Sequence, residues 1–326
     1  MDRVTRCGVV GVGYLGRFHA QKYASLSNAE LVAVVDSNLE QAQKVAQETG
    51  SEARTSYQSL FDEVQAVSIA VPTLHHYSVA KEFLERGIHV LIEKPITATL
   101  QEVQDLNAIA KKTGALIQVG HLERFSPGLM AAASQCKDPL FIESTRLAPF
   151  KLRGSDVNVV LDLMIHDVDI ILDLVKSPVR SIAASGARVL SNDIDIANAR
   201  IEFENGCIAN VTSSRVSLKT ERKMRIFQPG AYLSVDFQAR GLSVYQLGEG
   251  EQFPGVPEIV SEQKSYGESD PLRAEIIAFL DSIQNKKPVV VTGEDGERAL
   301  RAAFQITDLV LAKARDLSPT QKGTTA

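Results

Sequence analysis

The fold of this chain is decided near its N-terminus by the stretch GVVGVGYLG at residues 8–16. Three glycines of this stretch fit the pattern GxGxxG directly after an apolar run. The first glycine permits a tight turn, the second lets the backbone approach a pyrophosphate, and the third lets a helix pack on its strand. The free N–H groups at the start of that helix then bind the phosphates. We therefore expect a dinucleotide to contact Gly11, Gly13, Tyr14, Leu15 and Gly16.

A carboxylate further along the chain supports this interpretation. Asp36 follows the apolar run 31–35, about 20 residues after Gly16, where an acid binds the ribose 2′-hydroxyl of NAD. No arginine stands at 37 or 38 to receive the 2′-phosphate of NADP. NAD is therefore the predicted cofactor, with Asp36 and Ser37 at its ribose. The alternative is a glycine turn without a ligand, with Asp36 as an ordinary helix N-cap.

Apolar strands alternate with amphipathic helices as far as residue 119. The expected strands lie at 6–10, 31–35, 66–71, 89–93 and 116–119, and the expected helices at 15–26, 38–49, 74–86 and 99–112. Nearly continuous apolar strands between helices are typical of a parallel sheet covered on both faces. The sequence predicts an α/β Rossmann domain with a doubly wound parallel sheet over residues 1–120.

Polar residues follow two of these strands, at the edge where open α/β sheets bind ligands. VPTLHH at 71–76 ends one strand, and Glu93-Lys94-Pro95 ends another. The two histidines could instead cap or solvate the next helix, and the second group could be a charged loop turned by proline. Position favours function, so the expected cofactor contacts include Pro72, Thr73, His75, Glu93 and Lys94.

The pattern changes after Gly120. One helix is expected at 160–175, then several strands between 179 and 247, then helices at 271–284 and 295–315. Asn205-Gly206 between two apolar runs predicts a hairpin, because both residues accept positive φ. The sequence therefore predicts an α+β domain with a large, mainly antiparallel sheet over residues 121–317, followed by a polar tail at 318–326.

The helix expected at 160–175 gathers charge on one side. At 100° per residue, Asp162, His166, Asp169 and Asp173 fall close together on the helical wheel. Such a stripe often only faces water. A metal site is disfavoured, because nicotinamide dehydrogenation needs no metal and no cysteine cluster joins these residues. We expect no metal.

Composition excludes several classes of protein. A formal net charge of −5 disfavours nucleic-acid and anionic-membrane partners. The longest apolar runs are far shorter than the roughly 18–20 residues that span a bilayer. Three scattered cysteines argue against a disulfide framework. No targeting segment is recognised, so a cytoplasmic location is expected.

Together these motifs resemble the glucose-fructose oxidoreductase/inositol dehydrogenase (Gfo/Idh/MocA) family over nearly the whole chain. GVGYLG, Asp36, VPTLHH, EKP at 93–95 and LDLMIHDVDI at 161–170 stand in the family's order. The resemblance implies that Lys94 is the lysine near nicotinamide and substrate, and that Asp162 and His166 form the catalytic pair of the second domain. It also implies a homodimer or homotetramer built through the open face of the C-terminal sheet.

A finer resemblance is to the nucleotide-sugar 3-dehydrogenases of that family. GHLERFSP at 120–127 is similar to their GHxERFNP segment, with Ser126 in place of the usual asparagine. It implies substrate contacts from Lys94, His121, Arg124 and His166, although His121 and Arg124 could simply hold the domains together. The implied reaction is NAD-dependent oxidation of UDP-N-acetylglucosamine to its 3-keto form. A dehydrogenase of free polyols or hexoses and a non-catalytic dinucleotide-binding regulator are the alternatives.

Overall fold

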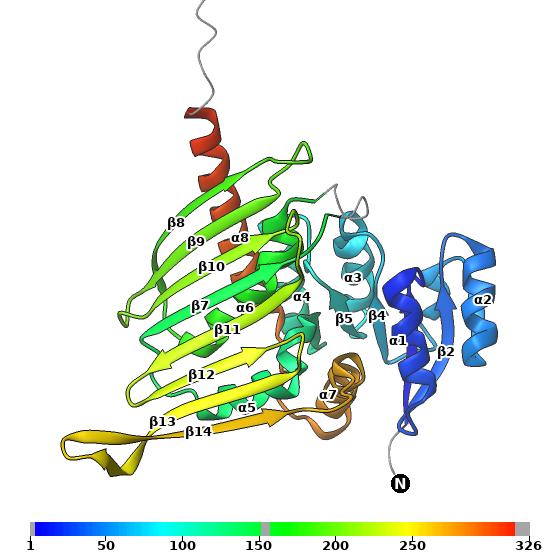
Figure 1. The fold of residues 1–326 in the computed structure, drawn as a ribbon. Coiled ribbons are helices and arrows are strands. Elements are labelled where there is room, and N and C mark those ends of the chain that lie inside the picture. The colour runs from blue at the N-terminus through cyan, green and yellow to red at the C-terminus, as the bar shows by residue number, and fades with distance from the viewer. Residues whose placement is uncertain (1–3, 151–156, 317–326) are drawn as a thin grey trace, which may run out of the picture. The chain divides into compact units, whose positions relative to one another are not determined.

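The computed structural model describes residues 4–150 and 157–316 (Figure 1). The chain divides into two compact units, one made of residues 1–125 and 270–300 and the other of residues 126–269 and 301–326. This division differs from the predicted boundary at 120/121, because the segment 270–300 returns to the first unit. Its helix α7 (Pro271–Asn285) carries Ile276, Phe279 and Leu280 into the same core as Cys7 and Val9.

The first unit contains the predicted parallel sheet. Its six strands lie in the order β3-β2-β1-β4-β5-β6, and every neighbouring pair is parallel. Their bounds are β1 (Thr5–Val10), β2 (Ala29–Val35), β3 (Glu52–Arg54), β4 (Ala66–Ile69), β5 (His89–Glu93) and β6 (Ile117–Gly120). The five predicted strands are confirmed. The edge strand β3 was missed, because three residues at an edge carry no apolar pattern.

The order of the strands reverses between β1 and β4, and this reversal positions the site. Right-handed crossovers on either side of it place helices on both faces of the sheet, and their loops separate at the carboxyl ends of β1 and β4. The helices are α1 (Tyr14–Ala24), α2 (Leu39–Thr49), α3 (His76–Leu84) and α4 (Leu100–Thr113). Short 3₁₀ segments lie at Tyr57–Leu60, Thr73–His75 and Leu122–Phe125.

Local signals explain where these helices begin and end. Asn38, not Asp36, caps α2, since its side chain accepts from the N–H groups of Glu40 and Gln41. Thr99 and Glu102 form a capping box at α4. The alternative that Asp36 is the N-cap of α2 is therefore wrong. The carboxylate of Asp36 instead accepts a hydrogen bond from Val12 in the glycine turn.

The second unit contains an eight-stranded sheet in the order β14-β13-β12-β11-β7-β10-β9-β8 (Figure 1). The strands are β7 (Phe141–Leu147), β8 (Val179–Ala187), β9 (Ile196–Phe203), β10 (Ile208–Ser214), β11 (Glu221–Gln228), β12 (Ala231–Asp236), β13 (Gly241–Phe253) and β14 (Val256–Ser265). All pairs are antiparallel except β7 with β10. The Asn205-Gly206 hairpin is confirmed between β9 and β10, with Gly206 at φ 88°.

The two faces of this sheet differ. The inward residues of β9 to β12, such as Ile201, Val211, Ile226 and Leu233, are buried. The outward residues include a row of ring contacts that runs through Phe141, Phe227, Tyr232 and Tyr245. Because successive residues of a strand face opposite sides, this row marks the open face of the sheet.

Three helices complete the second unit. α5 (Pro127–Gln135) packs on β12 and β13, and α6 (Ile165–Val175) packs on β7 and β10. The last helix, α8 (Gly293–Asp316), starts in the first unit and ends in the second. Within residues 4–150 and 157–316, no helix is long and apolar enough to cross a bilayer.

Candidate active site

The glycine turn between β1 and α1 has the geometry that a bound pyrophosphate needs. Gly11 has φ +83°, and a Cβ on Gly16 would lie 1.8 Å from the carbonyl oxygen of Gly11, so neither position accepts a side chain. Nothing lies within 4 Å of a Cβ built on Gly13, and no side chain caps α1 there. The open space and the uncapped N–H groups fit a dinucleotide phosphate at this turn. Tyr14 and Leu15, the next two residues, are exposed.

Asp36 is held against this turn. Its Oδ2 accepts from the N–H of Val12 at 3.0 Å, and its Oδ1 accepts from the N–H of Asn38 at 2.9 Å. Gln41 donates from its side-chain amide to the carbonyl oxygen of Val12. The carboxylate is thereby fixed at the carboxyl end of β2, beside the glycine turn. Ser37 follows it and is exposed.

The predicted loops after β4 and β5 are joined by His76. Its two ring nitrogens lie 2.8 Å from the carbonyl oxygen of Val71 and 3.0 Å from that of Pro95. Burial lowers the pKa of His76, although both carbonyl contacts oppose this shift. His76 is therefore a buried link between the two loops, whereas Pro72 and His75 are exposed and Thr73 is half-buried.

Lys94 follows Glu93, whose two carboxylate oxygens each have a hydrogen-bond partner. Oε1 of Glu93 lies 2.9 Å from Nε2 of His19, and its Oε2 accepts from the backbone N–H of Lys94 at 3.3 Å. Burial acts to raise the pKa of Glu93, but the hydrogen bond and charge of His19, together with Lys94, outweigh it. The pKa of Glu93 therefore lies below its usual value. Glu93 is ionised at neutral pH.

In the second unit, the predicted catalytic helix begins with a π-helical turn. This turn spans Val160–Met164 and contains Asp162, while His166 lies in the first turn of α6. Asn158 starts the turn, since its Oδ1 accepts from the N–H groups of Val160 and Leu161, both at 3.0 Å. Asp162 and His166 are half-buried. Single π turns often occur at functional sites, because they change the direction of side chains on a helix.

The stripe of Asp162, His166, Asp169 and Asp173 does not simply face water. Asp169 is buried. Arg146 donates two hydrogen bonds to Asp167, the residue next to His166. Nε of Arg146 lies 2.7 Å from Oδ2 of Asp167, and Nη2 lies 3.1 Å from Oδ1. Among residues 4–150 and 157–316, no group of three or more His, Cys, Asp and Glu side chains has the arrangement of a metal site.

His121 and Arg124 lie in the first unit and are nearly buried, with 2% and 8% exposed. A guanidinium nitrogen of Arg124 is 4.0 Å from Asp295, which forms a capping box with Thr292 at the start of α8. This geometry fits a structural role within the first unit. The substrate contacts of His121 and Arg124 stay a prediction.

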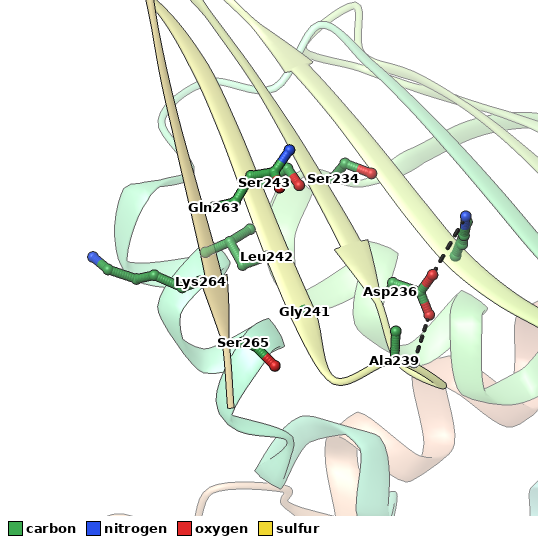
Figure 2. A pocket seen from close by; sticks show the side chains of 10 residues that line it. Ser234, Asp236, Ala239, Gly241, Leu242, Ser243, Gln263, Lys264 and Ser265 are labelled. Atoms are coloured by element: carbon green, nitrogen blue, oxygen red, sulfur yellow. Dashed lines mark hydrogen bonds and ion pairs between the residues drawn. The ribbon is translucent and has the colours of Figure 1, made fainter. Parts of the chain in front are cut away.

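Three cations of the second unit that could anchor a diphosphate already have carboxylate partners. Arg146 is buried against Asp167, Arg225 contacts Glu143, and Lys219 contacts Glu221. Lys151 and Arg153 lie outside the described residues. A hollow of about 500 Å³ in the second unit includes the Lys223–Asp236 ion pair (Figure 2). It contains none of the predicted site residues.

Sequence reasoning missed two buried residues that interact with Glu93. His19 lies on the buried side of α1 with Gly16, Ala20 and Tyr23. Glu275 on α7 is fully buried, and burial together with the charge of Glu93 raises its pKa well above the usual value. A polar residue on an apolar helix stripe was the available signal for both.

Comparisons with known proteins agree with this geometry. A family described as "Oxidoreductase family, NAD-binding Rossmann fold" matches residues 5–121. A second, described as "GFO/IDH/MocA C-terminal domain", matches residues 146–229. The UDP-N-acetylglucosamine 3-dehydrogenase of Acidithiobacillus ferrooxidans is 40% identical over 302 residues, 92% of this chain and 96% of that enzyme.

A solved structure and a more distant relative are also similar to this chain over most of its length. A solved structure of the Acidithiobacillus ferrooxidans enzyme superposes with a TM-score of 0.89 at 40% identity, covering 94% of this chain and 98% of its own. The scyllo-inositol 2-dehydrogenase (NAD(+)) of Bacillus subtilis is 29% identical over 330 residues, 94% of each chain. The similarity therefore runs through both units of the chain.

Proposed function

The chain belongs to the Gfo/Idh/MocA family of NAD-binding oxidoreductases, and from this premise we propose that it oxidises UDP-N-acetylglucosamine at C3 of the sugar. Its cofactor is NAD. The observation that carries the substrate is the 40% identity to a UDP-N-acetylglucosamine 3-dehydrogenase over both units. The scyllo-inositol relative is more distant at 29%. The segment GHLERFSP at 120–127 also supports the nucleotide sugar.

We propose catalytic roles for Lys94, Asp162 and His166. NAD, when bound, supplies the acceptor for the hydride that leaves C3. As this hydride leaves, the C3 hydroxyl must lose its proton, so the reaction needs a base and a cation beside the developing alkoxide. His166 takes the proton, Asp162 orients its ring, and Lys94 stabilises the oxygen. The alcohol thereby becomes a ketone, with one hydride and one proton removed.

Two features of the fold support these roles. Lys94 follows β5 at the carboxyl edge of the first sheet, where dinucleotide enzymes carry their chemistry. Asp162 and His166 lie on a π turn and the helix that follows it, which Arg146 and Asp167 fasten to β7.

The test is incubation of the protein with NAD and UDP-N-acetylglucosamine, coupled to an aminotransferase that consumes the 3-keto product. We expect NADH and, without the coupling enzyme, a sugar nucleotide lighter by the hydride and the proton that the oxidation removes. Free N-acetylglucosamine should lose kcat as well as affinity, because remote binding energy from the uridine diphosphate orients the sugar. Turnover of inositol or a free hexose without turnover of the nucleotide sugar would contradict the proposed substrate.

The catalytic roles need their own variants. Lys94→Ala and His166→Ala should each lose about 10²- to 10⁴-fold in kcat while keeping NADH binding, and Asp162→Asn should lose less. Near wild-type kcat in both alanine variants would refute the assigned residues. Fluorescence titration with NADH serves as the control for an intact first unit.

We also propose that the enzyme acts in the cytoplasm as a homodimer or homotetramer built through the open face of the eight-stranded sheet. The row formed by Phe141, Phe227, Tyr232 and Tyr245 supports this, because contiguous rings at a sheet surface favour association. The net charge of −5 supports a small-molecule substrate rather than a nucleic acid.

A further inference from the structure

A buried chain of polar side chains connects three elements beneath Lys94. His19 of α1 is 1% exposed, and its Nε2 lies 2.9 Å from Oε1 of Glu93. Its Nδ1 lies 3.2 Å from the hydroxyl of Ser68 on β4, which in turn lies 3.0 Å from the hydroxyl of Tyr23. The chain therefore runs from the interior of the sheet to the residue before Lys94.

The chemistry of the partners fixes the direction of the important bond. An ionised carboxylate only accepts hydrogen bonds, so the proton between His19 and Glu93 lies on Nε2 of His19. Ser68 and Tyr23 carry hydroxyls, which can donate or accept, and they adapt to either state of Nδ1. His19 is thus a donor to Glu93 in both its neutral and its charged form.

Glu93 has little freedom to move. One oxygen faces His19, and the other accepts from the backbone N–H of Lys94 at 3.3 Å. Gly120 of the neighbouring strand closes the remaining side, since a Cβ there would lie 3.0 Å from Oε2 and 3.1 Å from Cα of Glu93. The carboxylate is therefore held between a side chain, a strand and the backbone of the lysine.

Core packing by itself does not require this arrangement. Replacing a buried polar pair by apolar side chains of similar volume is often neutral or stabilising. The rest of the buried side of α1 is Gly16, Ala20 and Tyr23, and Ala20 and Tyr23 belong to the apolar core of the first unit. The pair therefore calls for a role other than packing.

We propose that His19 is a positioning residue that fixes the backbone of Lys94 through Glu93. This inference rests on the proposed catalytic role of Lys94. A displacement of about 1 Å in a catalytic group can cost about 10²-fold in rate, so a buried clamp on its backbone has a direct catalytic value. Glu93 and His19 themselves do not contact the reacting atoms in this proposal.

The experiment compares His19→Leu, His19→Gln and Glu93→Gln with Tyr23→Phe as the matched control. Leucine removes the donor, whereas glutamine keeps an N–H that reaches Glu93. Tyr23→Phe removes the far end of the same buried chain and leaves the bond to Glu93 in place. For each variant we measure kcat and KM for the nucleotide sugar, the melting temperature, and hydrogen exchange at the Lys94 amide, which needs no substrate.

His19→Leu and Glu93→Gln should lose about 10- to 100-fold in kcat with KM within a few-fold, and exchange at the Lys94 amide should accelerate. His19→Gln should restore kcat to within a few-fold of the wild type, and Tyr23→Phe should change neither kcat nor Lys94 exchange. Wild-type kcat and unchanged exchange in His19→Leu would overturn the proposal, as would an equal loss in Tyr23→Phe.

Failure of the proposed function gives a different result. Wild-type protein that does not oxidise UDP-N-acetylglucosamine refutes the substrate, while the exchange at the Lys94 amide still decides whether His19 and Glu93 hold that backbone. If His19→Leu does not fold, Glu93→Gln and the recovery in His19→Gln decide the same question. An increase in exchange without any loss of kcat would reject the catalytic value of the clamp.

Discussion

Replacing Asp167 by alanine tests how the second unit holds the helix that carries His166. Asp167 and Arg146 join α6 to β7, and their side chains are only 2% and 3% exposed. Two contacts, at 2.7 Å and 3.1 Å, make the pair bidentate. Asp167→Ala removes this bidentate carboxylate from the buried guanidinium of Arg146. The variant should therefore lose far more than the energy of an ordinary surface ion pair.

The magnitude follows from burial. Removing one partner of a buried ion pair costs about 3–5 kcal/mol, because the remaining charge stays desolvated. For a chain of 326 residues, such a loss lowers the melting temperature by roughly 4–7 °C. The double variant Arg146→Met/Asp167→Leu should recover most of the loss, since apolar replacement of a whole buried pair is often neutral or better.

Urea denaturation, followed by circular dichroism, measures the free energy of unfolding of each variant. The matched control is Glu143→Gln. Glu143 also lies on β7, and this variant breaks its ion pair with Arg225 of β11, in which the two side chains are 35% and 50% exposed. Exposed pairs contribute about 0–1 kcal/mol. Equal effects of Asp167→Ala and Glu143→Gln, or a double variant no more stable than Asp167→Ala, would refute the reasoning.

Three further predictions concern the cofactor, pH and assembly. Asp36 should repel the 2′-phosphate of NADP, so kcat/KM should be higher with NAD, and equal or better use of NADP would contradict its role. The raised pKa of buried Glu275 means that its contribution to stability is full below its usual pKa of 4.5 and is lost as pH rises toward the folded value. Relative to Glu275→Gln, wild type should therefore lose roughly tenfold in the folding equilibrium constant per pH unit above pH 5, and urea titrations that give parallel pH profiles would exclude this. Tyr232→Arg on the open sheet face should shift the protein to a smaller species in light scattering, and an unchanged mass would place the interface elsewhere.

Much of the fold could be predicted because its signals are local. The glycines at 11 and 16 are required by contacts within a few residues or with the adjacent loop, and the hairpin at Asn205-Gly206 uses the positive φ of Gly206. Strands buried on both faces are continuously apolar, so β1, β2, β4, β5 and β6 are visible without knowledge of their partners.

The missed elements lack such signals. β7 alternates between buried and half-buried residues, but its inward side chains include Ser144 and Arg146, so hydrophobic alternation does not reveal it. β14 is exposed throughout, and its pairing with β13 comes only from the folded sheet. α5 is short and rich in alanine and other small residues, and it was not predicted either.

The candidate site divides in the same way. The sequence by itself determined the glycine turn, Asp36, the EKP loop and the Asp162–His166 spacing, because each lies within one element or one turn. Only the tertiary structure decided that His19 meets Glu93 across 74 residues and that Arg146 reaches Asp167 rather than a phosphate. It also decided that α7 completes the first core, with Glu275 fully buried there. These contacts depend on which strands become neighbours, and strand order is set by the packing of the whole sheet, so no short stretch of sequence encodes them.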